Sequence, residues 1–280
     1  MVETMNRLLW QELLFRRNGI IGWGLGLTFF PLIYMGIYPQ VAAEMQNFEA
    51  LMELQMYQVM GISLGTFEDW MASTVILFVP LLASIYAIIN GTGTLAGEDD
   101  DGRLEMMVTL PVPRWKIVTV KAIALSVALL IIIFIVSLVT VGVFLAIESA
   151  VETTASVGNV FVAGLSVWPM TVAMGMISLF LGAFCPSRRV AALIAAAVLI
   201  LSYFGSNLAG MVSALEPLKP FFLFTYLDAT GNIVFNGPEL SDLLVLTGVA
   251  MVAFGLAALF FQRRDVTVGA WPWQRARAGA

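Results

Sequence analysis

Residues 117–147 have the sequence IVTVKAIALSVALLIIIFIVSLVTVGVFLAI, an apolar run that contains one charged side chain, Lys121. A helix of about 20 residues crosses the roughly 30 Å hydrocarbon core of a bilayer, so this longer run predicts a transmembrane helix that tilts, kinks or extends beyond it. Five further apolar runs are bounded by charges or turn residues. Together they predict six spans, at residues 20–37, 71–89, 117–147, 160–184, 190–208 and 243–261.

The composition of the whole chain agrees with these spans. Of the 280 residues, 60% are hydrophobic and 12% are charged, and the mean hydropathy is +0.91. A soluble domain of this length could not bury that fraction of apolar side chains. We therefore predict an all-α polytopic membrane protein that forms a single transmembrane domain over residues 1–280.

The positive charges predict how the chain is oriented. With six spans, the two termini and the loops after the second and fourth spans lie on one side of the membrane. Thirteen of the fourteen Lys and Arg residues lie in or at the edges of these segments, and only Lys219 lies on the other side. Cytoplasmic segments carry the excess of Lys and Arg, so both termini are expected in the cytoplasm of a cell inner membrane. The net charge of −5 says little about partners, and no nucleic-acid partner is expected.

Two residue types limit the chemistry of the chain. Cys185 is the only cysteine and there is no histidine, which excludes an intrachain disulfide, a redox dithiol and His-ligated metal sites. The glycine cluster at 91–97 lacks the lysine of a phosphate-binding loop. We predict neither an enzyme nor a bound cofactor or metal in this chain.

The first 18 residues predict a helix that lies in the inner membrane interface. Apolar residues fall on one helical face, and Glu12 and Arg16 are spaced to form an i,i+4 ion pair. The pair Asn18-Gly19 is a turn signal that we expect to redirect the chain into the first span. Packing of this helix on its own protein is an equally good interpretation.

Two outer segments are less informative. The first carries a stripe of methionines, which is typical of packing against neighbouring helices, although Cu(I) ligation and contact with apolar substrates stay open. The second, Leu215–Leu240, combines prolines with an aromatic cluster and predicts a turn that partly enters the membrane. The methionines are Met45, Met52, Met56 and Met60.

The cytoplasmic loop at residues 90–116, NGTGTLAGEDDDGRLEMMVTLPVPRWK, concentrates charged and turn residues between two apolar spans. Its acidic run at 98–101 precedes a short apolar helix at about 103–110, where carboxylates complement the N-terminal helix dipole. Pro111 and Pro113 end that helix and begin the next span. The pattern predicts a short helix held just below the membrane.

The same loop resembles the intracellular loop of six-span ABC-2 type permeases, the membrane subunits of ABC transporters. The family pattern is close to E-x-G-T-L-E-x-L-L-x-x-P-x-x-R, and this chain departs from it with Arg103 and with Met106-Met107. The ending Phe260-Phe261-Gln262-Arg263-Arg264-Asp265 is similar to the F-x-R-R-D ending common in the family. The matching loop residues are Gly102, Leu104, Glu105, Pro111 and Arg114.

The resemblance implies an ATP-driven exporter with two permease subunits and two copies of a separate ABC ATPase, which would bind ATP and Mg²⁺. The second permease is a copy of this chain or a relative. The loop helix would be the coupling helix, which docks into the ATPase. The residues expected to form that contact are Glu98, Gly102, Arg103, Leu104, Glu105, Pro111 and Arg114.

Two other classes of protein remain as alternatives: an ion-coupled secondary transporter and a membrane scaffold. No span has Asp, Glu or His near its middle, which disfavours the first class. Lys121 is interpreted as a side chain that reaches the inner interface rather than as a substrate site. A path lined by apolar and small polar residues favours a hydrophobic or amphipathic substrate.

Overall fold

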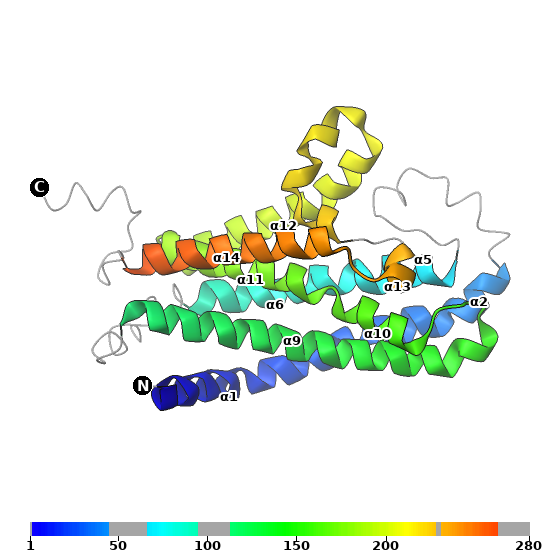
Figure 1. The fold of residues 1–280 in the computed structure, drawn as a ribbon, viewed down its shortest axis with the longest axis horizontal. Helices are drawn as coiled ribbons and strands as arrows, with labels where there is room; N and C mark the ends of the chain where they lie inside the picture. Colours follow the sequence, from blue (N-terminus) through cyan, green and yellow to red (C-terminus); the bar gives the residue numbers. More distant parts are fainter. Residues whose placement is uncertain (1, 45–65, 95–112, 228–230, 263–280) are drawn as a thin grey trace, which may run out of the picture.

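The computed structural model describes residues 2–44, 66–94, 113–227 and 231–262, and these residues form helices and no strand. Six helical segments are long and apolar enough to cross a membrane, which confirms the predicted number of spans. They run side by side along the long axis of the molecule (Figure 1). The segments are Met5–Ala42, Phe67–Thr92, Arg114–Ala150, Val157–Phe184, Arg188–Met211 and Leu240–Gln262.

The first segment begins with one continuous helix, whereas the sequence predicted an interfacial helix, a turn and then the first span. Helix α1 (Val2–Leu27) continues through Asn18 and Gly19, so the predicted turn at these residues is wrong. Gly19 packs closely here, because a Cβ at its position would lie 3.5 Å from the Tyr86 ring. Whether the first turns of α1 lie in the membrane interface stays a prediction.

The first two segments each contain a short π-helix near the outer end. Helix α1 is followed by the π-helix η1 (Pro31–Met35) and by α2 (Gly36–Glu44), and α5 (Phe67–Met71) is followed by the π-helix η3 (Ala72–Ile76) and by α6 (Phe78–Thr92). The two π-helices contact each other. The indole nitrogen Nε1 of Trp70 donates a hydrogen bond of 2.8 Å to the carbonyl oxygen of Tyr34. Such a bond satisfies a carbonyl that π geometry can leave exposed.

The third predicted span is one unbroken helix, α9 (Arg114–Ile147), followed by a short 3₁₀ turn, η5 (Glu148–Ala150). At 1.5 Å per residue, its 34 residues extend about 50 Å, well beyond a bilayer core of about 30 Å. The helix therefore tilts or projects from the membrane, as its sequence predicts.

The fourth predicted span is broken, which the sequence analysis did not anticipate. Helix α10 (Val157–Leu165) ends before Ser166, and α11 (Trp168–Phe184) begins two residues later with Pro169 in its first turn. Proline lacks the N–H that a continuous helix would need at this point. The Trp168 indole nitrogen donates to the carbonyl oxygen of Ser126 on α9 at 3.1 Å and fixes the start of α11.

The outer segment after α12 (Arg188–Met211) folds back onto that helix as two 3₁₀ pieces, η6 (Ser213–Phe221) and η7 (Leu223–Tyr226). The Phe224 backbone N–H donates to Ser202 Oγ at 3.1 Å, and Phe222 lies against Gly205. Figure 1 shows these pieces projecting sideways from the bundle. That this segment partly enters the membrane, as predicted for Leu215–Leu240, stays a prediction. Helices α13 (Asn232–Asn236) and α14 (Leu240–Gln262) complete the described chain.

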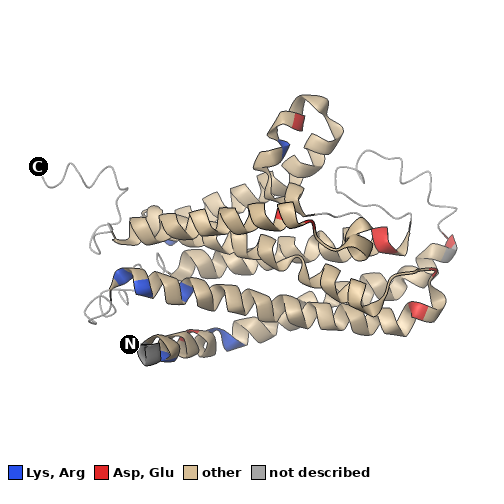
Figure 2. Cartoon of the chain, in the orientation of Figure 1, with Lys and Arg blue, Asp and Glu red and all other residues tan. Residues whose placement is uncertain are grey.

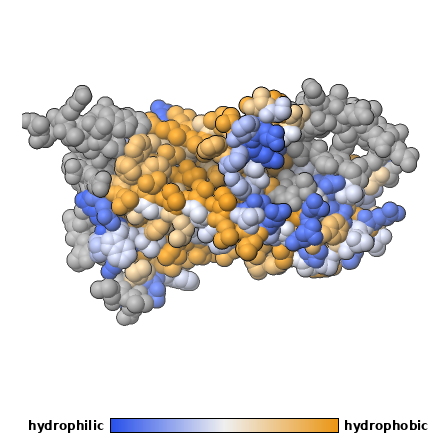
Figure 3. Space-filling model, turned by 45° about the horizontal axis from the view of Figure 1, so that its top comes forward, coloured by the Kyte–Doolittle hydropathy of each residue, from blue (hydrophilic) through white to orange (hydrophobic). Residues whose placement is uncertain are grey.

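Helix α11 lies at the centre of the bundle and packs against α6, α9, α12 and α14. The second segment is 72% buried over its most apolar stretch, whereas the last is only 22% buried. Helices α12 and α14 thus leave broad apolar faces exposed, and Figure 3 shows a wide apolar band on this side of the molecule. Such a surface is stable only in lipid or against another subunit.

Charge divides the two ends of the bundle. The starts of α1 and α9 and the end of α14 lie at one end (Figure 1), where Lys and Arg residues gather, and the Asp and Glu residues of the described part lie mostly toward the other (Figure 2). The two ends are called inner and outer below, after the predicted orientation. The start of the first described helix and the end of the last therefore lie at the same end, as six spans require.

Candidate functional site

The loop that carries the family motif is described only at its two ends. Glu98, Gly102, Arg103, Leu104, Glu105 and Pro111 lie outside the described residues, as do the methionine stripe and Arg263 onward. Arg114 is described and is the half-buried first residue of α9. The structure therefore defines how the two arms of the loop, the end of α6 and the start of α9, are held.

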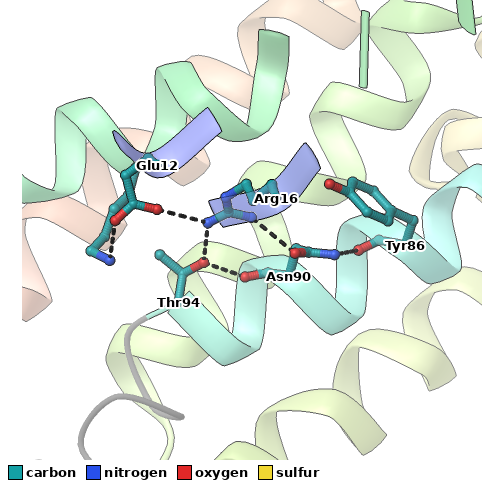
Figure 4. Close-up of polar contacts among 6 residues, drawn as sticks. Glu12, Arg16, Tyr86, Asn90 and Thr94 are labelled. Atoms are coloured by element: carbon teal, nitrogen blue, oxygen red, sulfur yellow. Dashed lines mark hydrogen bonds and ion pairs between the residues drawn. The ribbon is translucent and has the colours of Figure 1, made fainter. Parts of the chain in front are cut away.

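The first arm is fixed by Arg16 of α1. Its NH1 atom donates to Asn90 Oδ1 at 3.0 Å, and its NH2 atom donates to Thr94 Oγ1 at 2.8 Å. Thr94 Oγ1 donates in turn to the carbonyl oxygen of Asn90, and Asn90 Nδ2 donates to the carbonyl oxygen of Tyr86 at 2.9 Å. Arg16 is only 7% exposed, so these bonds form away from water (Figure 4). One guanidinium thus holds the last turn of α6 and the residue where the loop begins.

The second arm is fixed by Lys121 of α9. Its Nζ atom lies 2.9 Å from Glu12 Oε1, and the other carboxylate oxygen of Glu12 lies 3.5 Å from Arg16 NH2. Lys121 is 1% exposed, so the prediction that its ammonium reaches the membrane interface is wrong. The carboxylate of Glu12 compensates the charge of this buried ammonium directly, so the Lys121 side chain need not extend along its own helix to reach water. The i,i+4 pair predicted for Glu12 and Arg16 is confirmed.

These five residues, Glu12, Arg16, Asn90, Thr94 and Lys121, are called the inner polar cluster. Glu12 is its central member, because its two oxygens join Arg16, which holds the first arm, to Lys121 on the second. Removing one member of a buried charged pair typically destabilises a protein by about 3–5 kcal/mol. The cluster therefore makes the inner parts of α1, α6 and α9 one mechanical unit.

The first arm also packs closely on α11 and α12. A Cβ on Gly91 would lie 2.7 Å from Ser178 Cβ, and a Cβ on Gly182 would lie 3.2 Å from Thr92 Cα, so both glycines permit close helix contact. Arg188, at the start of α12, donates through NH2 to the carbonyl oxygen of Ile89 at 3.4 Å. Close backbone packing at small residues is typical of membrane helices. Motion of this arm would therefore displace α11 and α12 as well.

A second polar site lies at the outer end and is called the outer polar pocket. It encloses about 700 Å³ between α5, the segment after η5 and the start of α13. Thr153 Oγ1 donates to Glu68 Oε1 at 2.5 Å, and the Gly231 N–H donates to Asp69 Oδ1 at 2.9 Å. Its other lining residues include Glu152 and Asn232. The described residues contain no group of acidic or sulfur side chains arranged to hold a metal ion.

The inner polar cluster does not have the composition of a catalytic centre. The inner polar cluster contains two cations, one carboxylate and neutral hydrogen-bond donors. Among these described residues, no nucleophile lies beside a base that could activate it. What the cluster does supply is rigid connection between three helices at the base of a loop. That is a mechanical property rather than a chemical one.

The comparison with known families identifies the chain. The family described as ABC-2 family transporter protein matches residues 7–266. The chain belongs to this family. The match includes both polar sites, all six candidate spans except the first two residues of the first span, and the whole loop at 90–116. No curated protein matches the sequence.

Membership makes this chain a multi-pass membrane component of an ABC transporter, a permease that is not itself catalytic. It also gives the inner polar cluster a context, because the loop that resembles the intracellular loop of this family begins at Asn90 and ends five residues before Lys121. The sequence analysis missed Asn90 and Thr94 entirely and misjudged Lys121. A usable signal was present, since a lone lysine in an apolar span needs a carboxylate and Glu12 lies in the adjoining helix.

Proposed function

We propose that this ABC-2 permease is the membrane subunit of an ATP-driven exporter and that the loop at 90–116 couples it to a separate ABC ATPase. Two permease subunits and two ATPase subunits would form the working assembly in a cell inner membrane, with both termini of this chain in the cytoplasm. ATP and Mg²⁺ would be bound by the ATPase. Family membership and the excess of Lys and Arg at the inner end support this arrangement.

The observation that carries the proposal is the double contact of Glu12. Because this carboxylate joins Arg16 and Lys121, a force on the loop acts on α6 and α9 together rather than on one arm alone. The close packing of Gly91 and Gly182 extends the same displacement to α11. A docked ATPase that closes on ATP would in this way move four helices from one contact.

The coupling contact itself is assigned to Glu98, Gly102, Arg103, Leu104, Glu105, Pro111 and Arg114. Leu104 provides an apolar side chain on a short helix with a charged start, which suits docking into a protein groove. Arg114 follows this predicted helix by four residues in the sequence and is the first residue of α9. Displacement of the docked helix would therefore reach Lys121 within two turns of α9.

The proposed cargo is hydrophobic or amphipathic. The described spans line their interior with apolar, Ser and Thr side chains, and the charged residues of the described part gather toward the two ends. Such a lining recognises shape and excludes water rather than pairing with charge. Export, rather than import, is proposed from the resemblance of the loop to that of ABC exporters.

The test combines purification with a charge-reversal variant. The chain is purified from its own membranes in mild detergent, the proteins that accompany it are identified, and ATP hydrolysis is assayed. We expect a stoichiometric ABC ATPase. In the variant Arg103→Glu/Glu105→Arg, hydrolysis should continue while transport is lost, and Arg17→Glu, a charge reversal away from the loop, serves as the control.

Two outcomes would contradict the proposal. Recovery of the chain alone, or with an assembly that hydrolyses no ATP, would favour the scaffold or the ion-coupled carrier. Normal transport by the charge-reversal variant, with normal insertion, would remove the coupling role from the loop but leave the transporter assignment in place.

A further inference from the structure

The last turn of α6 lies against two arginines from other helices. Arg16 of α1 is one, and Arg188, the first residue of α12, is the other. The NH2 atom of Arg188 donates to the carbonyl oxygen of Ile89 at 3.4 Å. A Cβ placed on Gly93 would lie 3.2 Å from Cζ and from NH2 of Arg188 and 3.3 Å from its Nε. The guanidinium group of Arg188 therefore covers Gly93, the residue at which α6 ends.

Glycine at position 93 makes room for this contact. Its backbone angles, φ −68° and ψ −25°, are those of a right-handed helix, which most residues can adopt. The backbone therefore does not require a glycine at this position. A larger side chain, however, would occupy the space that the Arg188 guanidinium fills. The absence of a side chain at Gly93 thus serves the contact with α12.

The charge of Arg188 suits the end of α6 better than the start of its own helix. The C-terminus of a helix carries a partial negative charge and the N-terminus a partial positive one. The last turn of α6 contains no basic residue of its own, so Arg188 supplies a cation there. At the start of α12 the same charge opposes the dipole, and that helix is capped instead by Ser187, which accepts from the Val190 N–H at 3.4 Å. The placement of Arg188 therefore benefits α6 rather than α12.

Arg189 shows that positive charge at the inner end does not by itself produce this contact. It is the next residue, carries the same charge and is exposed, as Arg188 is. Within the described part of the chain, Arg189 forms no hydrogen bond or ion pair, whereas Arg188 contacts Ile89 and Gly93. An exposed charged contact adds little to the stability of a fold. The effect of Arg188 is therefore on the position of the first arm rather than on stability.

Helix α12 connects this contact to the outer segment formed by η6 and η7 (Figure 1). That segment is folded on α12, because the Phe224 N–H donates to Ser202 Oγ at 3.1 Å. The rings of Tyr203 and Phe224 also pack edge to face, with their centroids 5.3 Å apart. None of the five residues of the inner polar cluster lies on α12. Arg188 therefore provides a connection to α12 that the inner polar cluster lacks.

We propose that Arg188 is a positioning residue of the loop at 90–116. It holds the first arm of the loop against α12, so that α12 and the outer segment folded on it move with the loop. The inner polar cluster joins the same arm to α1 and α9 through separate contacts. This inference rests on the proposed function, because the loop is displaced only when an ATPase docks on it.

The main experiment records the response of the outer segment to ATP. The full-length chain is purified together with its ATPase, and an environment-sensitive fluorophore is attached to Leu218→Cys, at an exposed residue of η6, in a Cys185→Ala background. Fluorescence is measured before and after ATP and vanadate are added, and ATP hydrolysis is assayed in the same samples. Arg188→Ala is the test variant, and Arg189→Ala is the matched control.

We expect ATP to change the fluorescence of the labelled chain and of Arg189→Ala to the same extent. In Arg188→Ala the change should be about fivefold smaller, the lower end of the usual coupling between two sites, while hydrolysis continues. Arg188→Lys should give an intermediate change, because lysine keeps the charge at the end of α6 but lacks the planar group that covers Gly93. Equal changes in Arg188→Ala and Arg189→Ala, or hydrolysis without any change in the labelled chain, would overturn this inference alone.

A second substitution tests whether Gly93 acts through Arg188. Gly93→Ala keeps a helical backbone but places a Cβ where the guanidinium lies, so it should reduce the fluorescence change as Arg188→Ala does. Added to Arg188→Ala, it should cause no further reduction. Additive reductions would show that the two residues act separately and would overturn the assigned contact. A purified chain that carries no ATPase would instead overturn the proposed function, and this inference with it.

Discussion

The inner polar cluster and the outer polar pocket both join segments that are far apart in the sequence, but they do so with different chemistry. In the inner polar cluster, two buried cations share one carboxylate, and Lys121 is 1% exposed. In the outer polar pocket, the carboxylates of Glu68 and Asp69 accept hydrogen bonds from a hydroxyl and a backbone N–H beside a cavity of about 700 Å³. Glu68 is itself only 5% exposed, whereas Asp69 is half-buried and lines the cavity, so the charge of Asp69 can be hydrated.

This difference predicts how each site responds to force. A buried charge that loses its partner has no water to replace it, so the inner polar cluster resists separation of its helices. A carboxylate beside an open cavity can exchange a protein donor for water at little cost. We therefore expect the inner ends of α1, α6 and α9 to move as one unit and the outer ends of the spans to separate more readily.

The largest effect is expected for Glu12→Gln, which removes the only carboxylate of the inner polar cluster. Arg16 and Lys121 would lose their shared partner, and unfolding of the purified protein by SDS or urea should show a loss of about 3–5 kcal/mol. The matched change at the outer site, Asp69→Asn, should cost about 1–2 kcal/mol, because Asp69 is half-buried and lines a pocket that water can reach. Equal losses at the two sites would contradict the comparison.

The specificity of this effect can be measured with a second substitution. Lys121→Met removes the cation that faces Glu12, so the double variant Glu12→Gln/Lys121→Met should recover part of the stability lost by Glu12→Gln. The coupling energy between neighbouring residues in such a cycle is typically about 0.5–3 kcal/mol. Strictly additive losses would show that the two side chains do not act as a pair.

The next effect concerns the close packing of helices at each end of the bundle. In Gly91→Ala the new Cβ would lie 2.7 Å from Ser178 Cβ and 3.0 Å from the carbonyl oxygen of Gly175, atoms that cannot easily move, and we expect a loss of about 1–3 kcal/mol. In Gly205→Ala at the outer end, the closest atoms belong to the end of the Phe222 ring, which can rotate away. That loss should be smaller.

Gly142→Ala is the control for both packing variants, because a Cβ at Gly142 meets no atom within 4 Å. Relief of the glycine penalty should leave this variant unchanged or more stable by up to about 1 kcal/mol. Thermal unfolding of the three variants in the same detergent gives the order directly. If Gly91→Ala behaved like Gly142→Ala, the inner end would be less closely packed than the structure indicates.

A smaller change in stability but a specific change in function is expected for Arg16→Lys. A lysine keeps the charge beside Glu12 but cannot donate to Asn90 and Thr94 as a fork, so we expect a loss of about 1 kcal/mol. Transport per ATP hydrolysed should fall, because the first arm of the loop is released. The control Arg17→Lys, at the exposed neighbouring residue, should leave the stability and the transport per ATP hydrolysed unchanged. A similar fall in this control would show that the bonds of Arg16 to Asn90 and Thr94 are not the cause.

Much of the fold follows from local patterns in the sequence. Apolar runs of sufficient length predicted all six spans, because the bilayer imposes a minimum length on each of them. The pair Glu12–Arg16 followed from helical spacing alone and is formed at 3.5 Å. The break before α11 was missed, although Pro169 marks it, since membrane helices often continue through proline.

The inner polar cluster could not be assembled in the same way. Arg16 and Asn90 are separated by 74 residues, and Lys121 and Glu12 by 109 residues. Which helices become neighbours depends on packing of the whole bundle, and no local period encodes it. The same packing explains why the turn predicted at Asn18-Gly19 is absent. The contacts of Arg16 with Asn90 and of Gly19 with the Tyr86 ring hold these residues in the helix.

The smallest effect is expected for Thr153→Val in the outer polar pocket. This change removes the hydroxyl that donates to Glu68 and that accepts from the Ala155 N–H at 3.0 Å. Water in the pocket can replace both bonds, so the loss of unfolding free energy should be about 0.5–1 kcal/mol, and Thr154→Val, at an exposed residue of the same pocket, should change it less. A loss as large as that of Glu12→Gln would mean that water does not replace the hydrogen bond to Glu68, which is only 5% exposed, and the outer ends of the spans would then be as firmly joined as the inner ends.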